Sequence, residues 1–195
     1  MMKALESTTS IRSGTFWSQL KPGEHLLQCW ETEASLLDAL EGFVSSGLRE
    51  GDGVVVIATA AHLHEVEKRV RRHWLDIDRA RWEGRYIPLL AVETLKQFMG
   101  EDNLPDEERF RALGRKLVER AGGNNQRRVR LFGEMVGVLW GEGNAAGAIQ
   151  LENLWGRFIR EVGAPLFCAY PRSVFGDDAQ AFRGVCDMHT LVLPG

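Results

Sequence analysis

The chain has 195 residues, of which 44% are hydrophobic and 26% charged, the proportions of a globular protein that buries one sizeable core. Its 24 basic and 27 acidic residues leave a net charge of −3, so the bulk charge indicates no nucleic-acid or membrane-surface partner. Three cysteines argue against a secreted disulfide framework, and the longest uncharged run, Gly53 to His64, is shorter than the about 20 residues of a membrane-spanning helix. Because the N-terminus also lacks the apolar core of a signal peptide, we expect a soluble, cytoplasmic protein.

The chain is expected to divide into a short arm and one domain. Residues 1–22 are polar and rich in Ser and Thr, with one hydrophobic pair at Phe16 and Trp17. This composition predicts a flexible arm that ends in a short docking segment. Residues 23–195 contain no repeat and no internal linker, which predicts a single domain.

Short apolar runs alternate with segments of helical periodicity throughout the domain. The run 53–58 is apolar at every position, which is typical of a strand buried on both faces of a parallel sheet. Asn144 is expected to cap a long helix. A shorter helix is expected to bury Leu63, Val66, Val70 and Trp74. The strands are expected at 25–30, 53–58, 86–90, 128–132, 166–170 and 190–193. Such alternation predicts a three-layer α/β/α domain with a mostly parallel sheet.

In such a sheet, ligands bind outside the carboxyl ends of the strands. The loop after the first predicted strand reads Trp-Glu-Thr-Glu, and there is no glycine and no lysine between Glu24 and Glu41. A phosphate-binding loop needs glycines, whose backbone N–H groups wrap the phosphates, and a lysine followed by Ser or Thr. Hydrolysis of ATP by that chemistry is therefore excluded.

Several spaced motifs resemble one family. They are Gly133-Glu-Met-Val-Gly-Val-Leu-Trp140, Gly143-Asn144, Leu151-Glu-Asn-Leu-Trp155, Cys168-Ala-Tyr-Pro171 and His189, with His25 at the start of the first strand. Together they resemble the MEDS domain, a sensory domain of methanogens and methylotrophs, over residues 23–195. The resemblance implies a RecA-like fold that has lost its phosphate loop. It also implies sensing of small organic molecules, such as hydrocarbon derivatives, and transfer of the signal to a regulator.

Polar and aromatic residues follow several of the predicted strands, where a ligand would bind. Glu134 directly follows the strand at 128–132, and it is either a polar anchor for a ligand or a cap on the next helix. Trp30 and Tyr170 end two other strands, and they either line a mostly apolar pocket or simply cover the core. His189 would join this edge only if the last strand is antiparallel.

Other polar residues favour structural interpretations. Glu152 is expected on a partly exposed flank of the long helix, and His62 at a solvated helix N-terminus. Cys186 and His189 stand three residues apart, but there is no Cys-x-x-Cys motif, so we expect no metal site and no cofactor. The basic residues Arg127, Arg128 and Arg130 are expected to be solvated.

The sequence thus favours a non-catalytic sensory domain that binds a small, hydrocarbon-like molecule. The residues expected to line its site are Trp30, Glu31, Thr59, Glu134 and Tyr170, with His189 as a weaker candidate. The output partner is expected to be a separate histidine kinase or transcription regulator, without direct contact with nucleic acid or membrane, and a homodimer is compatible with the sequence.

The alternative is a protein–protein interaction module whose crevice is filled by side chains such as Trp30 and Met135. An enzyme ranks last, because no nucleophile and base can be paired in the sequence.

Overall fold

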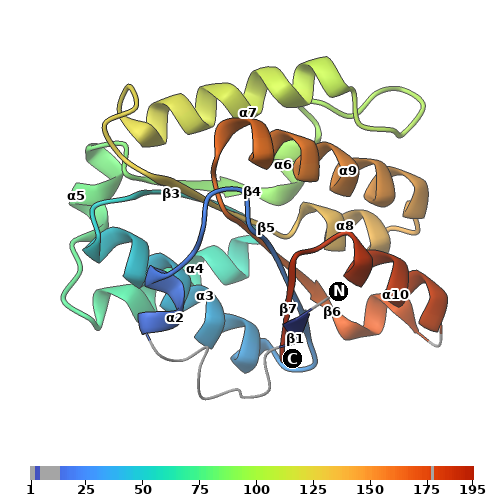
Figure 1. The fold of residues 1–195 in the computed structure, drawn as a ribbon, viewed down its shortest axis with the longest axis horizontal. Helices are drawn as coiled ribbons and strands as arrows, with labels where there is room; N and C mark the ends of the chain where they lie inside the picture. The colour runs from blue at the N-terminus through green and yellow to red at the C-terminus, as the bar shows by residue number, and fades with distance from the viewer. Residues whose placement is uncertain (1–2, 5–13, 177) are drawn as a thin grey trace.

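The computed structural model describes residues 3–4, 14–176 and 178–195, which form an α/β domain around one twisted sheet (Figure 1). The strand order is β1-β7-β2-β6-β5-β3-β4, and every pairing among these strands is parallel. The strands are β1 (Lys3–Ala4), β2 (His25–Trp30), β3 (Gly53–Ala58), β4 (Tyr86–Leu90), β5 (Val129–Gly133), β6 (Leu166–Pro171) and β7 (Leu191–Leu193). The predicted parallel α/β architecture is confirmed, and the last strand is parallel to β2.

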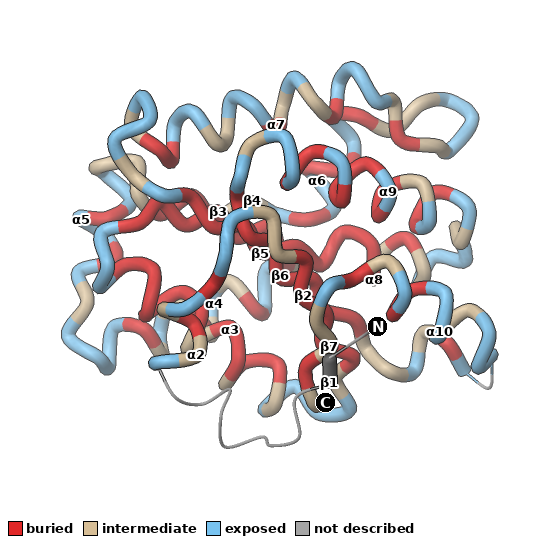
Figure 2. The backbone as a smooth tube through the Cα atoms, in the orientation of Figure 1, coloured by how far each residue is buried: buried red, intermediate tan, exposed pale blue. Residues whose placement is uncertain are grey.

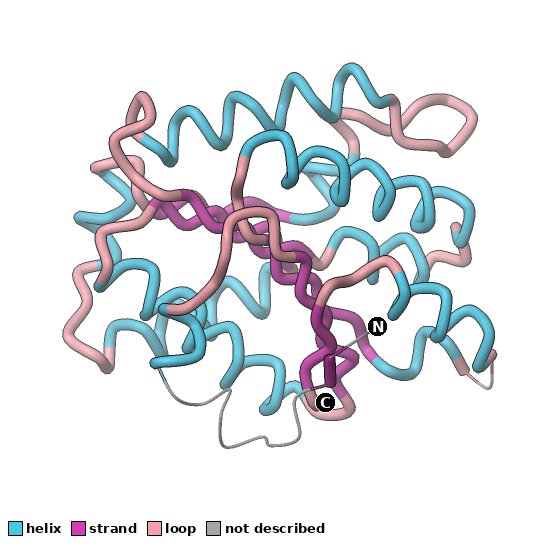
Figure 3. The backbone as a smooth tube through the Cα atoms, viewed as in Figure 1, coloured by secondary structure: helices cyan, strands magenta, loops and turns pink. Residues whose placement is uncertain are grey.

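Helices cover both faces of the sheet, as Figures 1 and 3 show. One face carries α2 (Gly14–Ser18), α3 (Glu33–Arg49), α4 (Ala60–Arg71) and α5 (Ile77–Trp82). The other carries α6 (Ala91–Leu95), α7 (Glu107–Gly122), α8 (Met135–Gly141), α9 (Ala145–Val162), the 3-10 turn η1 (Arg172–Phe175) and α10 (Ala179–Asp187). Within the described ranges, no helix is long and apolar enough to cross a membrane.

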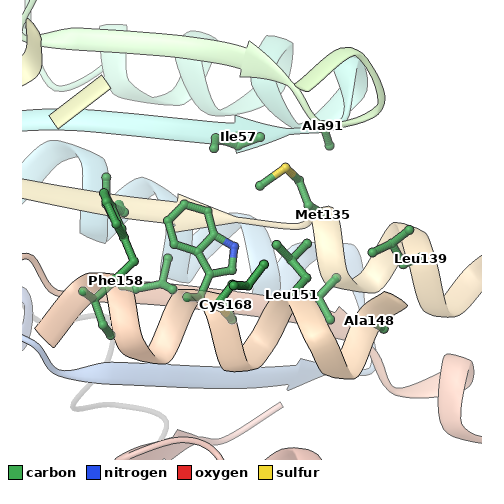
Figure 4. Packing of buried hydrophobic residues seen from close by; sticks show 14 of the residues in the cluster. Ile57, Ala91, Met135, Leu139, Ala148, Leu151, Phe158 and Cys168 are labelled. Atoms are coloured by element: carbon green, nitrogen blue, oxygen red, sulfur yellow. The ribbon is translucent and has the colours of Figure 1, made fainter. Parts of the chain in front are cut away.

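Each face of the sheet has its own hydrophobic core, because side chains alternate along the strands. In β3, Val54 and Val56 pack under α3 and α4, whereas Val55 and Ile57 pack under the opposite helices. The sheet is therefore buried almost throughout (Figure 2), and Figure 4 shows Ile57 with the side chains that α8 and α9 contribute to the second core. Strands buried on both faces are apolar at nearly every position, and the run 53–58 follows this pattern.

Helix termini follow the local sequence. The side-chain oxygen of Asn144 accepts a hydrogen bond from the backbone N–H of Gly147 at 2.9 Å, which confirms the predicted cap of α9. The apolar stripe predicted after β3 is correct for Val66 and Val70 but wrong for Trp74. Helix α4 ends at Arg71, so Trp74 leaves the helical register and its side chain is 96% exposed.

The segment 14–22, predicted as the end of a flexible arm, packs on the domain through α2. Trp17 is fully buried against α3, where Gly42 allows the close approach: a Cβ at that position would lie 2.5 Å from the Trp17 Nε1 atom. The rest of the predicted arm, apart from Lys3 and Ala4, lies outside the described residues.

Arg130 on β5 is fully buried, so the prediction that it is solvated is wrong. Its guanidinium forms an ion pair with Asp52, at 3.0 Å from Nε to Oδ2, and also donates to the backbone carbonyl of Phe43 at 3.3 Å. Gly47 leaves room for it, since a Cβ there would lie 2.7 Å from Arg130 Cδ. A buried cation next to a carboxylate and carbonyl oxygens is compensated, and removal of one partner leaves an unpaired buried charge.

Arg130→Met is expected to lower the free energy of unfolding by about 3–5 kcal/mol, because it leaves Asp52 buried without its cation. Urea denaturation would measure the loss. Arg109→Met is the matched control: that side chain is 64% exposed, and its loss should cost less than about 0.5 kcal/mol. Equal losses for the two variants would contradict the importance of the buried pair.

Candidate functional site

The carboxyl ends of the neighbouring strands β3 and β5 bring together Thr59 and Glu134. One carboxylate oxygen of Glu134 accepts a hydrogen bond from the backbone N–H of Thr59 at 2.8 Å. The other lies 2.5 Å from Nδ1 of His62, in the first turn of α4. The Thr59 hydroxyl caps the same helix by accepting from the His62 backbone N–H at 3.3 Å. The carboxylate thus joins two adjacent strand ends.

His62 connects this pair to the end of β2. Its ring meets the Trp30 ring edge-on at a centroid distance of 6.1 Å, and its Nε2 lies 3.7 Å from the exposed carboxylate of Glu33. The hydrogen bond to Glu134 raises the pKa of His62 above its ordinary value, against the opposing effect of burial. We call Trp30, Thr59, His62 and Glu134 the edge cluster.

The indole N–H of Trp30 is a free hydrogen-bond donor within the edge cluster. The nitrogen is shielded from solvent and has no hydrogen-bond partner among the residues that the structure describes. Buried polar groups are nearly always paired, and an unpaired one costs about 1–3 kcal/mol. The edge cluster therefore offers an aromatic face, one unused donor and a carboxylate–imidazole pair.

Two sequence interpretations change at this edge. Glu134 occupies the N-cap position of α8, but its carboxylate makes no capping bond there and instead reaches the start of α4. His62, predicted to be solvated, is buried, so that prediction is wrong. The sequence could have indicated this position, because His62 lies three residues after Thr59, in the first turn of α4. That turn packs against the end of β5, where Glu134 lies.

The remaining predicted site residues lie elsewhere. Glu31 is exposed. Tyr170 is fully buried on the opposite face of the sheet, among the residues of the α8–α9 core, so its ring and that of Trp30 do not face one another across one pocket. His189 precedes a parallel strand, beside the amino end of β2, where the Thr190 N–H donates to the His25 carbonyl.

His189 belongs to a second group of polar side chains, enclosed between the sheet and α9. Its partners are His25 on β2, Cys168 on β6 and Glu152 on α9. We call these four residues the core cluster; all are buried, and one potential ligand atom from each lies within 4.8 Å of the others. Figure 4 shows Cys168 among the side chains of this layer, with Leu151 and Phe158. The donor set, two imidazoles, a thiol and a carboxylate, is one that binds transition metals.

The buried position of Glu152 contradicts its predicted place on a partly exposed flank. It follows Ala148 by four residues and precedes Trp155 by three, and both are buried, so helical spacing places it on the stripe that faces the sheet. Burial raises the pKa of Glu152 and lowers the pKa values of His25 and His189 to about 4. The enclosure therefore disfavours charge on each of these groups.

One hollow lined by described residues lies at another end of the molecule. It has a volume of about 200 Å³, beside the amino ends of β5 and β6, and its lining includes Pro22, Arg127 and Pro165. It contains neither cluster.

Comparison with models of protein families identifies the family of this chain. A protein-family model described as "MEDS: MEthanogen/methylotroph, DcmR Sensory domain" matches residues 24–190. This range includes all residues of both clusters. No curated protein matches the chain.

Glu134→Gln is expected to lower the pKa of His62 to its ordinary value of 6.5 or below, because the carboxylate is the main cause of the raised value. A raised pKa in the folded state stabilises the protein below the unfolded pKa, and this stabilisation is lost as the pH rises through the folded pKa. The variant should therefore lose about 1–3 kcal/mol of stability at pH values near 6 and less under alkaline conditions.

NMR titration of the His62 ring and urea denaturation at several pH values would measure both effects. Glu142→Gln, at the exposed far end of α8, is the matched control and should change neither. An unchanged His62 titration in Glu134→Gln would contradict the pairing.

Proposed function

The chain belongs to the MEDS family of sensory domains, and we propose that its signal is a small, largely apolar organic molecule bound at the edge cluster. The observation that carries this proposal is the unpaired indole N–H of Trp30, next to the His62–Glu134 pair. A hydrogen-bond acceptor on a ligand would satisfy that donor, and the indole face would cover an apolar body. The preferred ligand is therefore uncharged, with one acceptor group.

Such a ligand would signal by changing the balance between two arrangements of the edge cluster. Glu134 links the start of α8 to the start of α4, so a contact that favours one position of its carboxylate moves both helix ends. A ligand shifts such an equilibrium only by its difference in affinity for the two states. The proposed reader is a separate histidine kinase or transcription regulator, and the role of the domain is non-catalytic.

A second candidate function, an interaction module without a small-molecule ligand, is favoured by exposed aromatic side chains. Met135, expected to fill the crevice with Trp30, instead packs in the core under α8 and α9, on the opposite face of the sheet. Trp74 and Trp82 are 96% and 87% exposed, and exposed tryptophans are typical of protein interfaces.

Short-chain ketones, alcohols and alkanes are suitable probes for the ligand, with native mass spectrometry and NMR titration as the measurements. Ketones and alcohols should bind more tightly than alkanes, because only they satisfy the Trp30 donor. Trp30→Phe keeps an aromatic face but removes the N–H, and it should weaken ketone binding about three- to tenfold. Trp82→Phe, the matched control on the exposed surface, should have no effect.

Equal binding of ketones and alkanes, or equal effects of the two tryptophan variants, would contradict the edge cluster as the site. If none of the probes binds and a partner instead requires Trp74 or Trp82, the interaction module is the better account.

A further inference from the structure

The core cluster carries an inference that is independent of the sensory site. We propose that His25, Glu152, Cys168 and His189 bind one Zn²⁺ ion, with each side chain providing one ligand atom. The spacing of these residues along the chain predicts no metal site, since no short metal-binding motif is present. Only the fold brings them together, from β2, α9, β6 and the residue pair before β7.

Three distances within the core cluster are close to the edge lengths of a tetrahedron around zinc. The His25 Nε2 atom lies 3.3 Å from Glu152 Oε2 and 3.4 Å from Cys168 Sγ, and His189 Nε2 lies 3.6 Å from Glu152 Oε1. Zinc bonds of about 2.0–2.3 Å in tetrahedral geometry place neighbouring ligand atoms roughly 3.3–3.8 Å apart. Three pairs of polar atoms already lie at such separations, two of them through different oxygens of Glu152. The four ligand atoms lie within 4.8 Å of one another, so a small shift of the side chains would complete a tetrahedron.

Several buried polar atoms of the core cluster lack a hydrogen-bond partner among the described residues, and a bound cation would satisfy them. The Nδ1 atom of His189 lies 2.8 Å from the Val185 carbonyl oxygen, which accepts, so the proton of the neutral ring is on Nδ1. The unprotonated Nε2 then faces a Glu152 oxygen at 3.6 Å, too far for a hydrogen bond. Nε2 and both Glu152 oxygens have no hydrogen-bond partner among the described residues, although all are buried.

The same contacts are typical of metal-binding histidines, which commonly donate their second ring N–H to a backbone carbonyl. His189 already makes that bond, and its free nitrogen points into the cluster. A cation at the centre of the core cluster would therefore bind His189 Nε2 and a Glu152 oxygen as ligands.

The donor set and its charge favour zinc over the oxygen-binding ions. Two imidazoles and a thiolate are ligands for zinc and other transition metals, whereas Mg²⁺ and Ca²⁺ require oxygen atoms. A Glu152 carboxylate and a Cys168 thiolate together neutralise a divalent ion, so the complete site is uncharged in the low-dielectric interior. When zinc binds, the Cys168 thiol releases its proton to solvent, together with any proton on Glu152.

Complete enclosure indicates that the ion is taken up during folding rather than exchanged on the surface. Four protein ligands leave no open position for a substrate, which is typical of structural rather than catalytic zinc. The ion would fasten α9 and the start of β7 to β2 and β6, on the sheet face opposite to the edge cluster.

The test is to unfold the full chain in guanidinium with a chelator and refold it with Co²⁺, which reports its ligands by absorption. One equivalent of Co²⁺ should remain after dialysis, with a sulfur-to-cobalt charge-transfer band and the intense d–d bands of tetrahedral cobalt. Refolding with Co²⁺ and Zn²⁺ together should give the zinc form without these bands. Protein purified without chelator should contain one zinc per chain by elemental analysis.

Cys168→Ser should abolish the charge-transfer band, whereas Cys186→Ser and Cys29→Ser, which change the other two buried thiols, should leave it intact. Glu152→Gln is nearly isosteric and should weaken Co²⁺ binding by more than about tenfold. The wild-type spectrum by itself reports thiolate ligation if Cys168→Ser does not fold.

The proposal is overturned if folded wild-type protein retains no metal, or if the charge-transfer band survives in Cys168→Ser. It is also overturned if Glu152→Gln folds with unchanged or greater stability in chelator and the wild type gains none from zinc. In that case a protonated Glu152 would complete the cluster through hydrogen bonds. Neither outcome bears on ligand binding by the edge cluster, which is measured with organic probes.

Discussion

Arg130, Glu134 and Glu152 are ionisable and buried beside the sheet. Each needs an opposite charge or hydrogen bonds, because a buried charge without a partner costs several kcal/mol. Arg130 is compensated by Asp52 and backbone carbonyl groups, and Glu134 by His62 and a backbone N–H. Glu152 differs, since neither of its oxygens has a hydrogen-bond partner among the described residues. Arg130 and Glu134 are thus compensated by groups of the protein itself, whereas Glu152 requires a bound cation or a proton.

This difference distinguishes the two proposed sites, which lie on opposite faces of the sheet. The edge cluster lies at the carboxyl ends of β2, β3 and β5, and its Trp30 side chain is partly exposed. The core cluster lies under α9 and is sealed. A complete ion pair beside a partly exposed aromatic ring suits reversible sensing, whereas an incomplete, enclosed cluster suits a permanently bound ion. The family membership gives the sensory role. We propose the edge cluster as the site that binds the ligand and the core cluster as a structural zinc site.

Much of the fold could be predicted from the sequence, because it depends on local signals. Apolar runs such as 53–58 identified the strands, and Asn144 identified the start of α9. The buried polar residues were harder. Arg130 alternates with apolar residues on β5, yet that strand is central, so both of its faces are buried and the partner Asp52 belongs to another part of the chain. The core cluster spans residues 25–189, and the direction of β7, which sequence alone left open, decides where His189 lies.

X-ray absorption spectroscopy of the zinc-loaded protein most directly tests whether a cation compensates Glu152. Our account predicts one sulfur at about 2.3 Å and three nitrogen or oxygen atoms at about 2.0–2.1 Å, with the imidazole scattering of two histidines. A shell of nitrogen and oxygen atoms alone would place the zinc at surface side chains. That result would leave Glu152 to be compensated by a proton and would contradict the account.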